Sequence, residues 1–190
     1  MKPKVKANLL SLLLTTFLSS GVTAMAAPDW GKENTGLQMS LGGSSRSDMI
    51  VTVRNTSKQD KMLIIGKMLA PTIISVQKGK DVELPQSQYQ FPDLVSLLIE
   101  DTAGKTREFV LKGPPGVAGT LEPLEVPLPA GAQYTLMAPL SEYIDGKTFA
   151  PPPKGSVHVT AKYTSKSSAN RVNRKYWSGS LISNTISIKL

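Results

Sequence analysis

Apolar and polar residues alternate with a period of two along much of the chain, and helical periodicity is nearly absent. At 37–41 and again at 49–53, an apolar side chain occupies every second position. Because successive side chains of a strand point to opposite faces, each segment predicts a strand with one buried face. Further apolar segments that predict strands lie at 61–68, 72–76, 94–100, 106–111, 132–137, 156–164 and 179–190.

Several of these segments allow a prediction of which side chains are buried. The segments 61–68 and 72–76 are apolar at both parities, which is typical of a strand buried on both faces. In the last two segments a single face is apolar. We expect the buried face of 156–164 to carry Val157, Val159, Ala161 and Tyr163, and that of 179–190 to carry Ile182, Ile186, Ile188 and Leu190.

Turn-forming residues separate the predicted strands. The segment 101–104 (DTAG) predicts a hairpin, in which Asp begins a type I turn and Gly supplies the positive φ of a bulge. The segment 139–143 (PLSEY) is a weak helix candidate of one turn at most. Proline-rich 122–127 is interpreted as a connection. Many short strands with turn signals between them favour an all-β fold, either an antiparallel sandwich or a barrel.

Residues 1–26 have the features of a secretory signal peptide. Three lysines lie within 2–6, an apolar segment follows at 9–18, and AMA at 24–26 fits a cleavage site. The apolar segment is shorter than the roughly 20 residues that a transmembrane helix needs. We therefore expect cleavage and export of a mature chain, 27–190, to the periplasm or outside the cell, with a bacterial envelope as the favoured setting.

Composition narrows the possible chemistry. The 190 residues include no Cys and one His, which excludes disulfides, zinc fingers, iron–sulfur clusters, a thiol nucleophile and a two-histidine metal site within one chain. Residues 27–145 contain 11 basic and 14 acidic side chains, whereas 146–190 contain eight basic and no acidic ones. The positive excess therefore lies near the C-terminus, where we expect 165–175 to form a flexible basic loop. Residues 55–57 (NTS) form a glycosylation sequon, which matters only in a eukaryotic secretory pathway.

Three short motifs carry a resemblance to a known group of proteins. They are VRN at 53–55 before a polar turn and a Leu/Ile-rich run, PPPKG at 151–155 before a strand ending in Tyr163, and WSG at 177–179 followed by Ser183-Asn184. These motifs resemble strands and corners of secreted bacterial Ig-like domain proteins, over most of residues 36–190. The resemblance implies one antiparallel Ig-like β-sandwich spanning the mature chain, and it brings no catalytic residues with it.

The residues themselves give little support to catalysis. A Ser hydrolase needs a base beside its nucleophile, and His158 is the single imidazole in the chain. Strand parity places His158 on the less apolar face of its strand, where a solvated side chain is expected. We therefore predict a protein that is not an enzyme, and a hydrolase using His158 is the remote alternative.

Carboxylates suggest no strong site either. Glu100 and Asp101 are adjacent, so they point to opposite faces of a strand and do not converge. A calcium site built from these two and Asp145 would need separate loops to come together, because no continuous calcium-binding loop is present. We therefore assign no metal and no cofactor.

Two loops offer candidate contact surfaces. One carries apolar side chains at a likely tip, which is typical of protein contacts; these are Pro114, Pro115 and Val117. The other combines positive charge with an aromatic ring, which suits polyanions, envelope glycans or anionic lipid head groups; its residues are Arg171, Arg174, Lys175 and Tyr176. We expect Trp177 to face the core and its neighbour Tyr176 to face outward. Protein binding is the first prediction and polyanion or glycan binding the alternative, while export argues against nucleic acid.

If the basic loop binds polyanions, replacing Arg171, Arg174 and Lys175 together with Ala should abolish the binding. The affinity of the unmodified protein should also fall steeply as salt rises, because neutralising a polyanion releases its counterions. Retention on an immobilised anionic polysaccharide, eluted with a salt gradient, measures both effects. Binding that survives both treatments contradicts the prediction.

Overall fold

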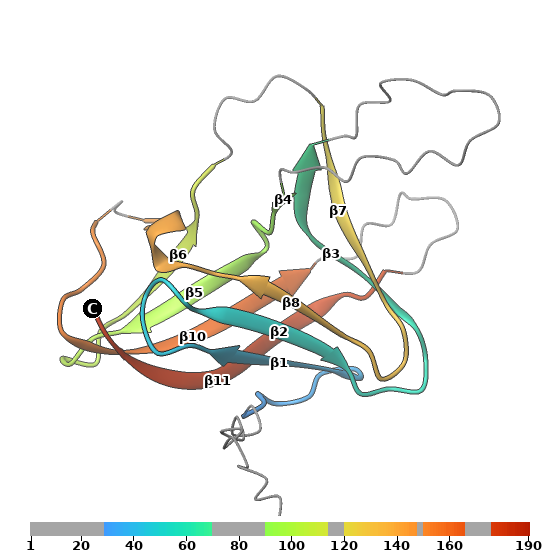
Figure 1. Ribbon diagram of the computed structural model, residues 1–190, viewed down its shortest axis with the longest axis horizontal. Coiled ribbons are helices and arrows are strands. Elements are labelled where there is room, and N and C mark those ends of the chain that lie inside the picture. Colours follow the sequence, from blue (N-terminus) through green and yellow to red (C-terminus); the bar gives the residue numbers. More distant parts are fainter. Residues whose placement is uncertain (1–28, 70–89, 114–119, 148–149, 166–175) are drawn as a thin grey trace, which may run out of the picture.

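The computed structural model describes residues 29–69, 90–113, 120–147, 150–165 and 176–190, and these residues form three antiparallel sheets (Figure 1). No α-helix occurs in the described residues, so the all-β prediction is confirmed. No helix in these ranges reaches the length and apolar character that a membrane span requires. The predicted signal peptide and the predicted strand at 72–76 lie outside the described residues.

The strands are distributed over the sheets as follows. The first sheet has the order β1 (Leu37–Gly42), β2 (Ile50–Asn55), β8 (Gln133–Met137). The second has the order β11 (Gly179–Lys189), β10 (Ser156–Ser165), β5 (Val95–Glu100), β6 (Thr106–Leu111), β9 (Tyr143–Asp145). The third has the order β4 (Gln90–Phe91), β3 (Lys61–Leu69), β7 (Leu121–Leu128).

One apolar core joins the three sheets. Its fully buried members include Met39 from the first sheet, Leu97 from the second and Leu63 from the third. Burial alternates along β2 and β10 as the sequence predicts, since the apolar parity of each strand faces this core. The apolar parity of β1 is buried too, and Ser40 between Met39 and Leu41 is also buried. The architecture is consistent with a β-sandwich, in which apolar faces of opposed sheets pack together.

The predicted buried face of β10 is confirmed, but that of β11 is wrong at its first position. Ile182 is 42% exposed, whereas Leu181 and Ile188 are buried. The cause is a bulge: Thr160 pairs with Thr185 but Lys162 pairs with Ile182, so Ser183 and Asn184 together oppose one residue. An extra residue in a strand reverses the parity of every side chain beyond it.

The proline-rich segment interpreted as a connection is a strand instead. β7 pairs with β3 from Lys61↔Leu128 to Leu69↔Leu121, although Pro123 and Pro127 lie within it. Proline has no N–H to donate to a neighbouring strand, so it is tolerated in a strand that is paired on one side only. β7 is the last strand of its sheet, which satisfies this condition.

Strand β3 is buried on one face and half-buried on the other, whereas the sequence predicted burial on both faces.

The two predicted local structures at 101–104 and 139–143 are confirmed. Asp101 accepts hydrogen bonds at Oδ1 from the amides of Ala103 and Lys105, and Gly104 has a φ of 75° in the β5–β6 hairpin. Residues Leu140–Glu142 form one 3₁₀ turn, η1, which leads from β8 to β9. The chain therefore changes sheets between these two strands.

Asn55 holds the corner where β2 leads to β3 and β7 leads to β8. Its side-chain nitrogen donates to the carbonyls of Gln59 and Leu128, at 2.7 and 2.9 Å. Its side-chain oxygen accepts from the amide and the hydroxyl of Ser57. The residue is 2% exposed. In the folded protein the side-chain nitrogen of Asn55 therefore donates two hydrogen bonds and is buried, which leaves no room for a glycan on it.

Asn184 joins the edge of β11 to the edge of β1 across the gap between two sheets. Its Oδ1 accepts from the amide of Leu41 at 2.7 Å, and its Nδ2 donates to the carbonyl of Leu41 at 3.0 Å. The side-chain amide thus takes the place of a backbone neighbour. The bulge places Asn184 in this position, while the Ser183 hydroxyl accepts from the Ala161 amide that the bulge leaves free.

Replacing Asn184 with Ala should lower the free energy of unfolding by about 2 kcal/mol, because it leaves the amide and the carbonyl of Leu41 without partners. Thr185→Ala, at an exposed neighbouring position of β11, is the matched control and should change stability far less. Urea denaturation followed by circular dichroism measures both. Equal effects of the two substitutions would show that the bridge does not stabilise the fold.

Candidate binding surfaces

Most of the predicted contact residues lie outside the described residues. This holds for Pro114, Pro115 and Val117 in one loop, and for Arg171, Arg174 and Lys175 in the other. The structure therefore places neither loop, and both contact surfaces stay predictions. Ser165 ends β10 and is buried, so the beginning of the predicted flexible loop belongs to the sheet.

Tyr176 is described, and the expectation that it faces solvent is wrong. Tyr176 is 9% exposed and Trp177 is 6% exposed, so both neighbours are buried. Tyr176 forms an isolated parallel bridge with Met62, and its hydroxyl donates to Glu125 at 2.7 Å. Trp177 stacks on Tyr163, with ring centroids 5.6 Å apart. Strand alternation does not apply here because the two residues precede β11 and pack against different partners.

His158 is exposed on β10, between the buried Val157 and Val159, as its parity predicts. Its Nδ1 is 3.0 Å from the Ser187 hydroxyl, and Glu100 occupies the paired position on β5. Ser, His and Glu thus stand on three adjacent strands of one sheet. However, the three pockets at Leu140, at Asp145 and beside β8 are not lined by any of these three residues, and a hydrolase needs a site that holds substrate against its nucleophile.

The remaining candidate carboxylates are engaged in separate places. Asp101 accepts hydrogen bonds within its own turn. Asp145 is 2% exposed and lies 3.6 Å from the guanidinium of Arg107. Glu125 accepts from Tyr176. Within the described ranges no three His, Asp or Glu side chains gather as metal ligands would. The three residues weighed for calcium are accordingly not brought together as a site.

The outer edge of β8 is the feature that the sequence did not reveal. The amide of Asn55 donates to Ala132, and the amide of Ala138 donates to Met49. Because partners alternate along an antiparallel ladder, even-numbered residues of β8 bond to β2 and odd-numbered ones point outward. Those are Gln133, Thr135 and Met137, and no backbone partner is found for them within the described residues.

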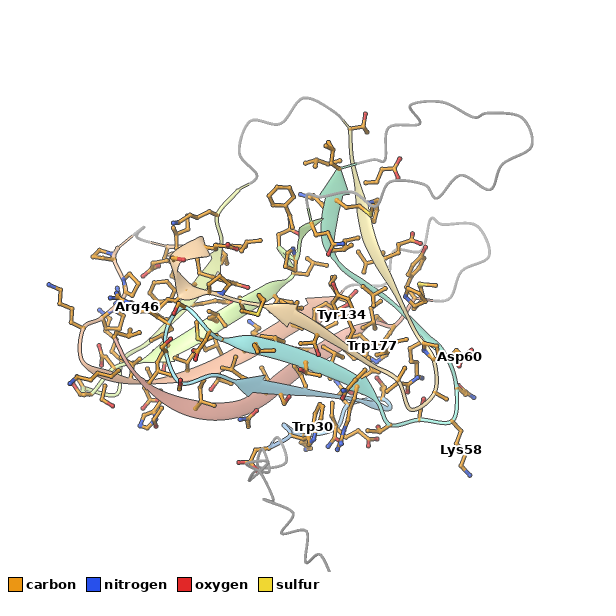
Figure 2. The ribbon with its side chains drawn as sticks, viewed as in Figure 1. Trp30, Arg46, Lys58, Asp60, Tyr134 and Trp177 are labelled. Carbon is orange, nitrogen blue, oxygen red and sulfur yellow. The ribbon has the colours of Figure 1, made fainter. Side chains whose placement is uncertain are left out.

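A groove of about 280 Å³ runs beside this edge. One wall consists of β8 residues 134–137, and the other includes Pro92, Leu111 and Leu124. Tyr134 (Figure 2) is half-buried, and burial raises the pKa of its phenol. Met137 is 57% exposed, and the charged residue in the groove lining is Glu142. The groove therefore offers apolar contacts next to free backbone groups.

The loop between β1 and β2 is held by the carboxylate of Asp48. Its Oδ1 accepts from the amides of Ser44 and Ser45, at 3.1 and 2.6 Å, and its Oδ2 accepts from the Ser44 hydroxyl. The hydrogen bond from the Ser45 amide is the largest cause that lowers the pKa of Asp48 below its ordinary 3.8. This exposed loop is thus ordered by its own side chains.

Comparison of the chain with protein-family models, with curated proteins and with solved structures gives no match.

Acidification should release the β1–β2 loop. A carboxyl whose pKa is lowered on folding stabilises the fold above its ordinary pKa, and this contribution is lost as the pH falls below 3.8 through the folded value. Asp48→Ala should therefore speed hydrogen exchange at the amides of Ser44 and Ser45 at neutral pH. The Asp48 variant should also lose less free energy of unfolding than the unmodified protein as the pH falls below 3.8. Glu122→Ala, at an exposed position of β7, serves as the control; slow exchange in the Asp48 variant would contradict the assignment.

Proposed function

We propose that this protein is an exported, non-catalytic binding module with an Ig-like fold, which binds an extended segment of a partner protein along the outer edge of β8. Export rests on the sequence of residues 1–26, and the Ig-like assignment rests on the motifs described above. The observation that carries the binding proposal is the free, uncharged edge of β8.

Other long edges of the described sheets are protected, and β8 differs from them. β7 contains two prolines. On β1, the Met39 carbonyl accepts from Gly31, and both backbone groups of Leu41 are bonded to Asn184. β11 carries a bulge and ends in Lys189. Prolines, bulges, charges and coverage are the devices by which sheet edges avoid pairing with other chains.

Within the described ranges, β8 has none of these devices. Its sequence, QYTLM, contains no proline and no charge, and its register with β2 runs without interruption. An extended peptide could therefore add as a further strand, with hydrogen bonds to the backbone of Gln133, Thr135 and Met137. The neighbouring groove would receive apolar side chains of the peptide, and Glu142 would favour a basic residue there.

Thr135→Pro should abolish peptide binding and leave the fold intact. The amide of Thr135 points outward, so proline removes a hydrogen bond to the partner without breaking the ladder with β2. Thr135→Ala is the matched control, since it also loses the hydroxyl contact with Thr52 but keeps the amide.

The test selects peptides from a random library on the unmodified protein and then measures the affinity of each selected peptide for both variants. The expected result is retention by Thr135→Ala and loss by Thr135→Pro, with unchanged amide spectra elsewhere in the sheet. Peptides that bind both variants equally would place the binding site away from the β8 edge and overturn the proposal.

A further inference from the structure

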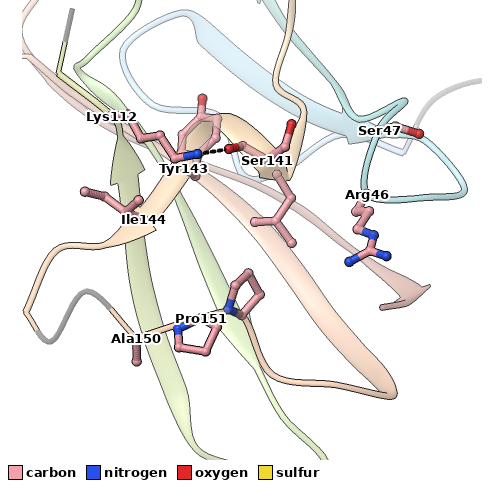
Figure 3. A pocket seen from close by; sticks show the side chains of 10 residues that line it. Arg46, Ser47, Lys112, Ser141, Tyr143, Ile144, Ala150 and Pro151 are labelled. Atoms are coloured by element: carbon pink, nitrogen blue, oxygen red, sulfur yellow. Dashed lines mark hydrogen bonds between the residues drawn. The ribbon is translucent and has the colours of Figure 1, made fainter. Parts of the chain in front are cut away.

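A second hollow lies where the β1–β2 loop meets η1 and β9 (Figure 3). Its volume is about 430 Å³, within the range of pockets that hold small molecules. The lining is shared between the loop, the end of β6, η1 and β9, and the proline segment before β10; the apolar members are Leu140, Tyr143, Ile144, Ala150, Pro151 and Pro152.

Both charged side chains in the lining of this pocket are positive. Arg46 and Lys112 belong to the lining, and no carboxylate does. Glu142, which adjoins two lining residues in the sequence, lines the groove beside β8 instead. Arg46 is exposed, and its guanidinium makes no ion pair or hydrogen bond with any residue in the described ranges. The pocket therefore offers one unused guanidinium next to an apolar wall.

The Lys112 ammonium and the backbone of Arg46 are held in position before any ligand arrives. The carbonyl of Arg46 accepts from the amide of Leu140 at 2.7 Å, which fixes the loop to η1. Asp48 orders the rest of that loop from within, so its charge is used locally. On the other side, the Lys112 ammonium donates to the carbonyl of Ser141, as Figure 3 shows. A site built from fixed groups loses less entropy when a ligand binds.

Tyr143 contributes its ring to the apolar wall rather than its hydroxyl. The residue is 3% exposed, and its hydroxyl has no hydrogen-bond partner within the described residues. In Figure 3 the hydroxyl points away from Ala150 and Pro151. Burial, together with the charge of Glu142, raises the pKa of this phenol, so it stays neutral and adds no negative charge near the pocket.

We propose that this pocket binds a small molecule that carries a carboxylate on an apolar body. The guanidinium of Arg46 presents a fork of donors that matches two carboxylate oxygens, and the Lys112 ammonium adds a second positive charge. The apolar body lies against Leu140, Ile144 and the prolines. This site is separate from the β8 edge, so it stands whether or not a partner strand binds there.

The test uses octanoate as the probe and octan-1-ol as its neutral counterpart, titrated into the protein and followed by amide chemical shifts. Octanoate should give saturable shifts at Leu140, Ile144 and Ala150, and octan-1-ol should bind at least tenfold more weakly. Butyrate, which keeps the carboxylate and loses most of the apolar body, should also bind more weakly.

Arg46→Gln and Lys112→Gln should each weaken octanoate binding by about tenfold, which corresponds to one charge-assisted hydrogen bond. Lys58→Gln is the matched control, because Lys58 lies at the opposite end of the molecule from Arg46 (Figure 2). Equal binding of octanoate and octan-1-ol, equal binding to the Arg46 variant, or no saturable shift at these amides would each overturn the proposal.

Discussion

A pair of hydrogen bonds from the Asn184 side chain to the backbone of Leu41 joins the edges of two sheets that one apolar core packs together. A side-chain amide has one donor and one acceptor side, as a peptide group does, so it can close a gap that is too wide for strand pairing. Here it joins β11 to β1, while the bulge that positions it is stabilised by the hydroxyl of Ser183. Gly31 lies against the same bulge, since a Cβ at that position would be 1.9 Å from the carbonyl oxygen of Ile182.

Because Asn184 bonds to the edge of β1, the two edges of the first sheet differ in how many of their backbone groups are hydrogen-bonded. Where β1 meets β11, the outward-facing backbone groups of β1 are hydrogen-bonded. Met39 accepts from the amide of Gly31, and Leu41 bonds to the side chain of Asn184. On the opposite side, η1 leads from β8 to β9, and both the β8 groove and the cationic pocket lie there. The β1–β11 side thus stabilises the fold, whereas the β8–β9 side has backbone and charged groups that a ligand can contact.

The strands of the core could be predicted because burial imposes a period of two, as β2 and β10 show. The errors arose where a longer-range contact overrides that period. The parity of β11 depends on a bulge that is recognised only from its pairing with β10, and Pro123 and Pro127 are compatible with a strand only because β7 is an edge. The candidate surfaces could not be predicted at all. Which strand covers the β8 edge and which side chain meets Arg46, among the residues that the structure describes, depend on where other strands lie.

The corner residue Asn55 must remain an amide for the corner to keep its hydrogen bonds. Deamidation would convert its nitrogen, which now donates to two carbonyls, into a carboxylate oxygen that can only accept. Two buried acceptors would then face a negative charge without any proton between them. A molecule changed in this way keeps its sequence of strands but loses the hydrogen bonds of the corner that orders β2, β3, β7 and β8.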